Sequence, residues 1–160
     1  MTAQKRSKLL VVDASVAHSA GETEHPMSSS CRDALLAIRK ICHRVVMTEA
    51  IRDEWNRHMS RFTRKWLVSM VARKKAPERE VEHLDHFLDR VCKHLAADEQ
   101  DGLRKDLCLI EAACEGDGII ITRDHAIMDI WAKCQNRFGL PKPIRWINPV
   151  TDGTEVFEHL

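Results

Sequence analysis

Two aspartates of this sequence lie where chemistry is expected, next to its two most apolar segments. Asp13 directly follows the apolar run 9–12, and Asp124 follows the apolar run 119–121 after two intervening residues. The carboxyl ends of parallel strands meet at one edge of a sheet, and ligands bind in the crevice there. If both runs are strands of one parallel sheet, we expect the two carboxylates to lie close together.

Two more acids fit the same crevice. Glu54 lies six residues into the helix predicted after the apolar run 45–47, and Asp106 lies at the margin of an apolar helix face. A close pair of ionised carboxylates repels by about 4 kcal/mol at about 4 Å and an effective dielectric of about 20. Four such groups together therefore call for a cation. Because all the ligands are oxygens, Mg²⁺ or Mn²⁺ is the expected ion.

Each acid also has a simpler explanation. An aspartate after a strand is commonly a helix cap, which would account for Asp124 alone. A capping role explains Asp13 less well, because no helix is predicted to begin directly after it. Glu54 has Glu49 and Asp53 as rivals within about one turn of the same predicted helix. The four acids taken together are stronger evidence for a site than any one of them.

The elements that would position these acids alternate between strand and helix. Short apolar runs predict the strands, and apolar positions at helical spacing predict the helices. We predict strands at 9–12, 45–47, 119–122 and 144–147, and helices at about 28–38, 48–75, 78–97, 103–115 and 125–134. The alternation predicts a three-layer α/β/α sandwich around a short, mostly parallel sheet. One domain would span residues 1–150, with an inserted helical hairpin at about 56–100 and an acidic C-terminal tail at 151–160.

Composition narrows the class of protein. The chain has 160 residues, 44% of them hydrophobic, with 25 Lys and Arg against 24 Asp and Glu. This is the composition of a folded globular domain, and the formal charge of +1 excludes a histone-like, strongly basic nucleic-acid binder. Six cysteines without a C-x-x-C pair indicate a reducing compartment. No apolar stretch resembles a signal sequence or a membrane span, so we expect a cytoplasmic protein.

Four blocks of sequence carry the four acids together with characteristic neighbours. They read LLVVDASV, TEAIRDE, KDLCLIEAA and IITRD, at residues 9–16, 48–54, 105–113 and 120–124. In these blocks, and in their order, the chain resembles the PIN domain family. The resemblance covers most of the chain outside residues 56–100. It is specific because four separated acids each have their expected neighbours.

The resemblance implies a metal-dependent endoribonuclease. The catalytic, metal-binding cluster of the family, which would hold Mg²⁺ or Mn²⁺, matches Asp13, Glu54, Asp106 and Asp124 of this chain. Ser15 and Thr122 match positions that support this cluster. Hydrolysis of RNA in such families leaves a 5′-phosphate and a 3′-hydroxyl, and the bound ions activate the attacking water.

Residues 56–100 are longer than the corresponding part of compact toxin-type PIN domains, and their charge is uneven. The stretch 56–76 holds seven Lys or Arg and no acid, whereas 78–101 holds eight acids. One interpretation is a phosphate track for RNA. Its contacts would be Arg61, Arg64, Lys65 and, from another block, Arg123. The other is a hairpin whose helices pair their charges and bury Phe62 and Trp66. We favour the hairpin, because aromatic residues at helical spacing usually belong to the core.

Two further features of this stretch bear on metals and partners. His83 and His86 lie one turn apart, but neither an H-E-x-x-H motif nor a cysteine pair accompanies them. We therefore expect a solvated helix face there rather than a zinc site. The hairpin would also offer more apolar area than a lone small domain needs, so a homodimer is a candidate assembly. The apolar faces in question carry Phe62, Trp66, Leu84 and Leu88.

Three other functions stay open from the sequence. The first is a catalytically inactive RNA-binding or scaffolding module with the same fold. The second is a toxin that is held inactive by an antitoxin protein. The third is a phosphoaspartate enzyme that uses Asp13, although such enzymes usually have a second acid two residues later, where this chain has Ser15.

Overall fold

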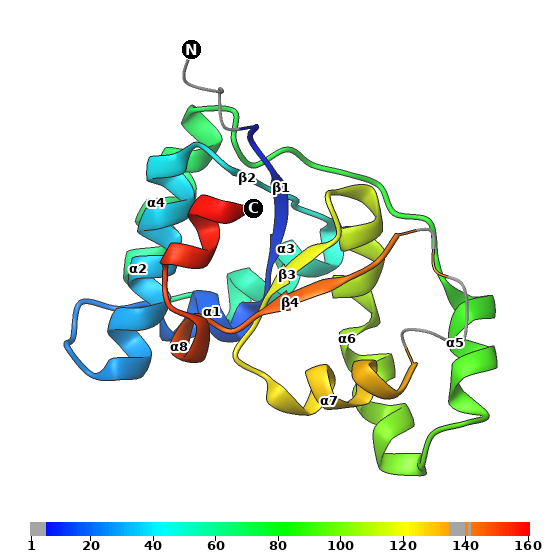
Figure 1. The fold of residues 1–160 in the computed structure, drawn as a ribbon. Helices are drawn as coiled ribbons and strands as arrows, with labels where there is room; N and C mark the ends of the chain where they lie inside the picture. Colours follow the sequence, from blue (N-terminus) through cyan, green and yellow to red (C-terminus); the bar gives the residue numbers. More distant parts are fainter. Residues whose placement is uncertain (1–5, 135–139, 141) are drawn as a thin grey trace.

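The computed structural model describes residues 6–134, 140 and 142–160, and a four-stranded sheet lies at its centre (Figure 1). In the order β2-β1-β3-β4, the sheet is built from β1 (Leu9–Val12), β2 (Arg44–Val45), β3 (Ile119–Ile121) and β4 (Arg145–Ile147). Every pairing between neighbouring strands is parallel. The predicted α/β class with a parallel sheet is therefore confirmed.

Helices cover both faces of the sheet. They are α1 (Ala14–Ser19), α2 (Pro26–Ile41), α3 (Glu49–His58), α4 (Arg61–Ala72), α5 (Asp85–Cys92), α6 (Ala97–Glu115), α7 (His125–Cys134), α8 (Pro149–Asp152) and the 3₁₀ helix η1 (Glu155–His159). α6 packs on β1 and β3 with α7 beside it, whereas α2 packs with α4, α8 and η1 on the other side (Figure 1). None of the helices in the described part of the chain has the length and hydrophobicity to cross a membrane.

The two central strands, β1 and β3, are apolar throughout because both of their faces are covered. All four residues of β1 and all three residues of β3 are buried. This explains why the sequence shows continuous apolar runs here instead of the alternation typical of a strand with one solvated face. Each fully buried aliphatic side chain contributes roughly 1.5–3 kcal/mol to folding. Asp13, at the end of β1, and the residues that follow β3 are thus attached to a tightly packed part of the core.

The helix predicted from residue 48 to about 75 is in fact two helices. α3 begins after Thr48, whose hydroxyl accepts a hydrogen bond from Ile51 N at 3.2 Å. α4 begins after Ser60, whose hydroxyl accepts from Thr63 N at 3.1 Å. Both are side-chain caps of the kind that serine and threonine form at helix N-termini. The break turns the chain so that α4 packs against α2.

The predicted helical hairpin at about 56–100 does not form. Residues 73–84 are not helical, and the helix predicted at 78–97 is reduced to the eight residues of α5. α4 and α5 lie on opposite sides of the sheet (Figure 1). The basic helix and the acidic segment are therefore separated, and the prediction that they pair their charges is wrong.

The segment after α4 is extended because it covers the open edge of β2. Lys75 O accepts a hydrogen bond from Val45 N at 2.8 Å, and Pro77 O accepts from Met47 N at 3.0 Å. Unpaired backbone N–H groups at a sheet edge are unfavourable, so these bonds stabilise the extended conformation. Pro77 also opposes a helix at this point because it lacks an N–H.

The apolar faces considered for a homodimer are used inside the chain. Trp66 is buried and donates its indole N–H to Leu35 O of α2 at 2.7 Å. Leu88 is also buried, and Phe62 and Leu84 are partly buried against the core. These faces provide no surplus apolar surface, so the homodimer stays a prediction without this support.

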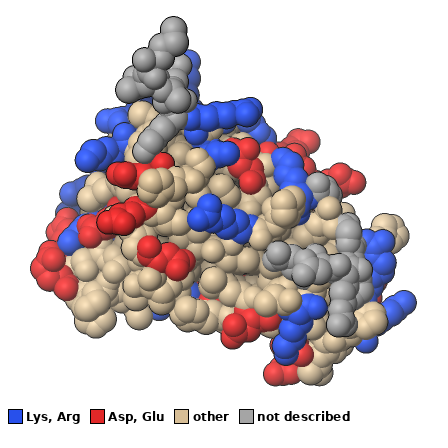
Figure 2. All heavy atoms as spheres, in the orientation of Figure 1, with Lys and Arg blue, Asp and Glu red and all other residues tan. Residues whose placement is uncertain are grey.

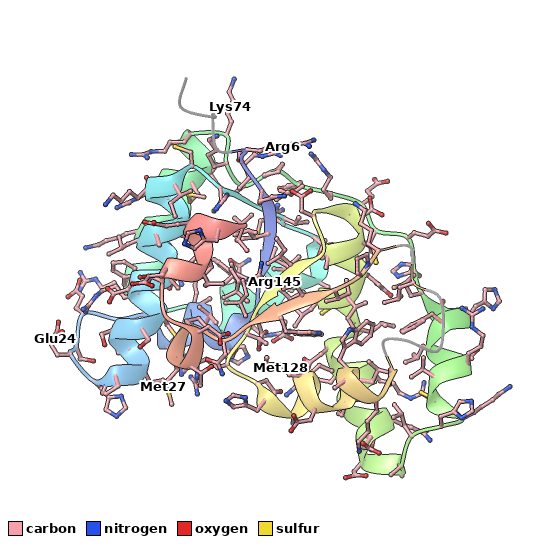
Figure 3. The ribbon with its side chains drawn as sticks, in the orientation of Figure 1. Arg6, Glu24, Met27, Lys74, Met128 and Arg145 are labelled. Carbon is pink, nitrogen blue, oxygen red and sulfur yellow. The ribbon has the colours of Figure 1, made fainter. Side chains whose placement is uncertain are left out.

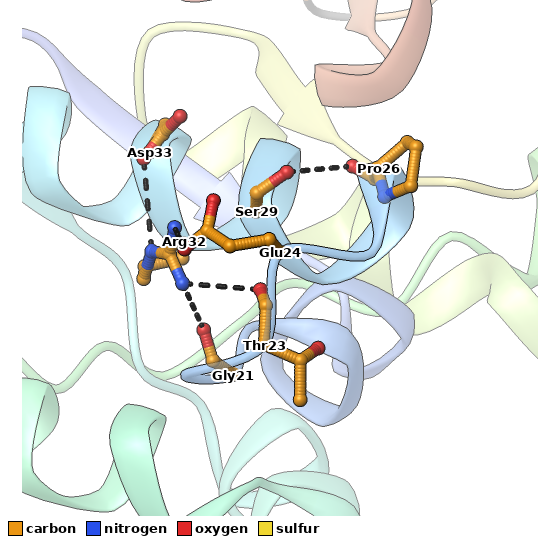
Figure 4. Close-up of polar contacts among 7 residues, drawn as sticks. All are labelled: Gly21, Thr23, Glu24, Pro26, Ser29, Arg32 and Asp33. Carbon is orange, nitrogen blue, oxygen red and sulfur yellow. Dashed lines mark hydrogen bonds and ion pairs between the residues drawn. The ribbon is translucent and has the colours of Figure 1, made fainter.

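The loop before α2 is shorter than predicted. α2 begins at Pro26 with His25 as its capping residue, ahead of the serines predicted to cap it. Proline is favoured in the first turn because the N–H that it lacks would be unpaired there. Arg32 closes the loop by donating to Gly21 O at 2.9 Å and to Thr23 O at 3.2 Å (Figure 4).

The last ten residues, predicted as an acidic tail, fold back onto the domain. α8 and η1 pack against α2, and Phe157 is fully buried. His43 fixes this end of the chain: its Nδ1 accepts from Lys8 N at 3.0 Å, so its Nε2 is the atom that donates to Phe157 O at 2.8 Å. The C-terminal segment is thus part of the α2 layer.

Candidate active site

The four predicted acids line one cavity of about 350 Å³, which we call the acidic cavity. Asp13 comes from the end of β1, Glu54 from α3, Asp106 from α6, and Asp124 from the segment between β3 and α7. The cavity lies at the carboxyl ends of the neighbouring strands β1 and β3, where ligands bind in parallel sheets. The fold thus brings together acids that are far apart in the sequence.

Two hydroxyl groups orient the Asp13 carboxylate. Ser15 Oγ and Thr122 Oγ1 each donate a hydrogen bond to Asp13 Oδ2 at 2.7 Å. Ser15 Oγ also accepts from the backbone N–H of Arg123 at 3.2 Å, which fixes the hydroxyl in turn. Both residues predicted to support the cluster therefore contact Asp13. Among the described residues no hydrogen bond reaches Asp13 Oδ1, which leaves that oxygen available to a ligand.

Asp13 and Asp124 differ in their relation to the helices that follow them. Asp124 Oδ1 accepts from Ala126 N at 2.9 Å, so it does cap α7, as the simpler explanation proposed, while also lining the cavity. α1 begins directly after Asp13, contrary to the prediction, but the Asp13 side chain makes no capping bond to it. The orientation of Asp13 is therefore set by the two hydroxyls and not by a helix.

Glu54 lines the acidic cavity, and neither of its two rivals does. Its carboxylate pairs with Arg57 and lies 3.7 Å from His58 Nε2. Glu49 and Asp53, from the same helix, line a second cavity of about 570 Å³ instead. The helical twist of α3 thus directs only one of the three acids toward Asp13.

Asp106 shows the electrostatic effect of the cluster. Burial first, and then the charges of Asp13 and Asp124, raise the pKa of its carboxyl group from 3.8 to about 6. Lys105 opposes the shift, and Glu54 adds a smaller contribution in the same direction as the other acids. In the described part of the chain no hydrogen bond reaches this carboxylate. A buried acid facing like charges without donors of its own is typical of functional sites.

The acidic cavity also contains polar residues that were not predicted. His18 and His58 line it, as does Lys105. His58 could have been found, because it follows Glu54 by one helical turn and therefore shares its face. The spacing of His18 gave no such signal. His18 Nδ1 lies 2.9 Å from His58 O, and because a carbonyl only accepts, the proton of this bond is on Nδ1.

One wall of the acidic cavity is apolar. It is formed by Ile51, Trp55 and Leu109. Trp55 is anchored by its indole N–H, which donates to Val12 O at 3.0 Å and so ties α3 to the end of β1. Cys108 also lines the cavity, but burial and then the charge of Asp106 raise the pKa of its thiol to about 11. This thiol stays protonated at neutral pH and is therefore a poor nucleophile.

The chemistry of the donors fits a hard divalent ion, although the acids do not form a ready-made cage. Within the described residues, no three His, Cys, Asp or Glu side chains are arranged to hold a metal ion together. Two of the acids have other partners, since Asp124 caps α7 and Glu54 pairs with Arg57. Mg²⁺ is commonly held by only one or two carboxylates, with waters and a substrate phosphate as its other ligands.

The predicted RNA contacts lie outside the acidic cavity. Arg61, Arg64 and Lys65 are exposed on α4. The guanidinium group of Arg123 instead donates to the Ser19 hydroxyl and so ties the end of β3 to α1. Arg123 therefore has a structural contact, whereas the three residues of α4 are open to solvent.

The second cavity contains a buried carboxylate of a different kind. Glu111 of α6 is only 6% exposed, yet its Oε1 accepts from Leu84 N at 3.2 Å and its Oε2 lies 3.3 Å from His83 Nδ1. His83 itself is largely exposed, as predicted, but it lies before α5 and not on a helix face. Glu111 thus holds the start of α5 against α6, a role that the sequence did not reveal.

Comparison of the sequence with protein-family models and with curated proteins finds no match. A function for this chain is therefore inferred from its own residues and their geometry.

Proposed function

We propose that this chain is a PIN-like endoribonuclease that depends on Mg²⁺ or Mn²⁺. The observation that carries the proposal is the acidic cavity, in which acids from four separate elements face one space at the carboxyl end of a parallel sheet. The raised pKa of Asp106 supports it: burial is the main cause of the shift, and the charges of Asp13 and Asp124 add to it. The reaction is hydrolysis of an RNA phosphodiester bond.

Asp13 and Asp106 are the carboxylates best placed to hold the ion. Asp13 presents Oδ1, which no hydrogen bond within the described residues engages, and Asp106 is relieved of repulsion when a cation binds. Glu54 and Asp124 line the same space and would act through the waters around the ion. When bound, the ion supplies an activated water, orients the scissile phosphate and offsets charge on the leaving oxygen.

The other residues of the cavity prepare the site. Ser15 and Thr122 hold Asp13 in one orientation, which limits the reorganisation needed during the reaction. Lys105, on the rim beside Asp106, offers a positive charge to a phosphate oxygen. The apolar wall excludes water from part of the cavity and so strengthens the electrostatic interactions there.

The first test is cleavage of a labelled RNA with Mg²⁺ or Mn²⁺, compared with the same reaction in EDTA. We expect cleavage only with the ion, and a loss of at least about 100-fold in the Asp13→Asn variant. Asp129→Asn is the matched control, because Asp129 is an exposed acid of α7 that does not line the cavity. Undiminished cleavage by Asp13→Asn, or in EDTA, would overturn the proposal. RNA binding without any cleavage would indicate the inactive module instead.

A further inference from the structure

The outer surface of α4 and the turn after it forms an uncompensated basic face. We define the α4 basic face as Arg61, Arg64, Lys65, Arg73 and Lys74, all of which are exposed. The stretch 56–76 that contains them has no acidic residue. We propose that this face binds the phosphate backbone of RNA outside the acidic cavity. This inference rests on the proposed function only in taking RNA as the ligand.

The charge of this face is not neutralised inside the protein. None of its five residues forms an ion pair with another described residue. The helix α5, which was predicted to pair its charges with α4, lies on the opposite side of the sheet (Figure 1). Figure 2 shows Lys and Arg gathered around the end of the molecule where α4 ends and β2 begins. In Figure 3, Lys74 projects there away from the ribbon.

The aromatic residues of α4 lie on its inner side and pack in the core, so they need no separate role in RNA binding. Trp66 and Met70 are buried, and the ring of Trp66 packs in a tilted arrangement against Trp55 of α3, with the ring centroids 6.3 Å apart. Phe62 is partly buried. Bases would therefore find no exposed aromatic platform on this helix. Contacts with a nucleic acid there would be made to phosphates, and they would carry no sequence preference.

The α4 basic face begins at the rim of the acidic cavity. Thr63 Oγ1 and Ser60 N both bond to Ala17 O of α1, at 2.7 and 3.0 Å. His18, the next residue of α1, lines the acidic cavity, and so does His58 at the end of α3. From this rim the twelve residues of α4 extend for about 18 Å.

This placement favours RNA over an acidic protein as the ligand. A strand whose scissile phosphate lies in the acidic cavity must leave it on some side, and on the side of α1 the neighbouring element is the first turn of α4, which carries Arg61 and Arg64. The acids of the cavity repel the backbone that they cleave. A neighbouring cationic surface offsets that repulsion by releasing counterions from the phosphates.

Binding can be measured with the Asp13→Asn variant, which keeps the RNA intact. We compare Arg61→Gln/Arg64→Gln/Lys65→Gln with the control Lys93→Gln/Arg104→Gln/Arg145→Gln, which removes three exposed charges from other elements. Fluorescence anisotropy reports the affinity for a trinucleotide and for a strand of about ten nucleotides. Thermal unfolding checks that both triple variants fold, because surface substitutions of this kind usually shift stability by less than about 0.5 kcal/mol.

We expect the α4 triple variant to bind the longer strand at least about 10-fold more weakly, and the control to lose less than about 2-fold. The slope of log affinity against log salt concentration should become less steep by about 2, because three phosphate contacts are lost and each accounts for about 0.7 on a single strand. Equal affinities of the two triple variants would overturn the inference.

The outcome for the α4 basic face can be separated from the outcome for the proposed function. RNA binding that depends on α4, in a wild-type protein that cleaves nothing, would support the face and contradict the nuclease. Suppose instead that the protein cleaves RNA with the metal, and that the α4 substitutions do not change its affinity for the longer strand. This result would support the proposed nuclease and contradict RNA binding by the α4 basic face.

Discussion

The two cavities beside α6 each contain a carboxylate that is at least partly buried, and the surroundings of the two carboxylates are opposite: one has a hydrogen-bond donor and the other faces like charges. Glu111, in the second cavity, receives a hydrogen bond from the backbone N–H of Leu84 and lies beside His83. Asp106, in the acidic cavity, faces Asp13 and Asp124 and receives no hydrogen bond from the described residues. The first acid joins two segments of the fold, whereas the second is repelled by its surroundings.

This difference shows that burial alone does not identify a chemical site. A buried polar group with its own donors stabilises the fold, because its desolvation is offset by hydrogen bonds. A carboxylate kept among like charges destabilises the fold until a cation or a proton joins it. Such groups persist where function requires them, at the expense of stability. Asp106 has this signature and Glu111 does not.

The largest expected effect that separates the two cavities is on catalysis. Asp106→Asn should lower metal-dependent RNA cleavage by about 100-fold or more, because a carboxylate facing the ion is lost. Glu111→Gln, on the same helix but in the second cavity, should leave cleavage within about 3-fold of wild type. Cleavage rates for both variants, measured at saturating Mn²⁺, check this. Equal losses in the two variants would remove the distinction between the cavities.

The same Asp106→Asn variant should be more stable than the wild type when no metal is present. With the Asp106 pKa raised from 3.8 to about 6, the folded state binds more protons than the unfolded state between about pH 4 and 6. Wild-type stability should therefore fall, relative to the variant, as the pH rises through this window. Above it we expect a difference of roughly 1 kcal/mol after allowance for solvent screening of a partly exposed group. Urea unfolding at pH 4 and pH 7 measures it.

A stability effect of opposite sign is expected in the second cavity. Glu111→Ala should destabilise the fold by roughly 1–3 kcal/mol, because the partly buried N–H of Leu84 loses its acceptor. Glu111→Gln keeps an oxygen acceptor and should cost less. Urea unfolding of both variants in EDTA gives the two values. If Glu111→Ala unfolds at the same urea concentration as the wild type, then Glu111 does not join α5 to α6.

Local patterns predicted β1, β3 and the acids better than they predicted the helices or β2, which is Arg44–Val45 and not 45–47. β1 and β3 are short runs of buried aliphatic residues. Asp13 and Asp124 follow these strands within three residues, and the other two acids lie on helices with clear apolar faces. The missing hairpin has a nonlocal cause. Helical spacing in the stretch 78–97 cannot show that the N–H groups of Val45 and Met47 need acceptors at the edge of β2.

The supporting residues of the acidic cavity divide in the same way. Ser15 lies two residues from Asp13, so its contact was predictable from the local motif. His18 and Lys105 enter the cavity only because α1 and α6 are packed around the ends of β1 and β3. The pKa shift of Asp106 likewise depends on burial, which is set by the whole fold. Local patterns therefore indicated the acids but not their surroundings.

The most direct test of the central claim is a crystal structure of the protein soaked with Mn²⁺, read from its anomalous density. We predict a peak in the acidic cavity within about 2.0–2.3 Å of a carboxylate oxygen of Asp13, with Asp106 as a second ligand or one water away. A cavity without a peak at millimolar Mn²⁺, or an ion bound only elsewhere on the chain, would contradict the account.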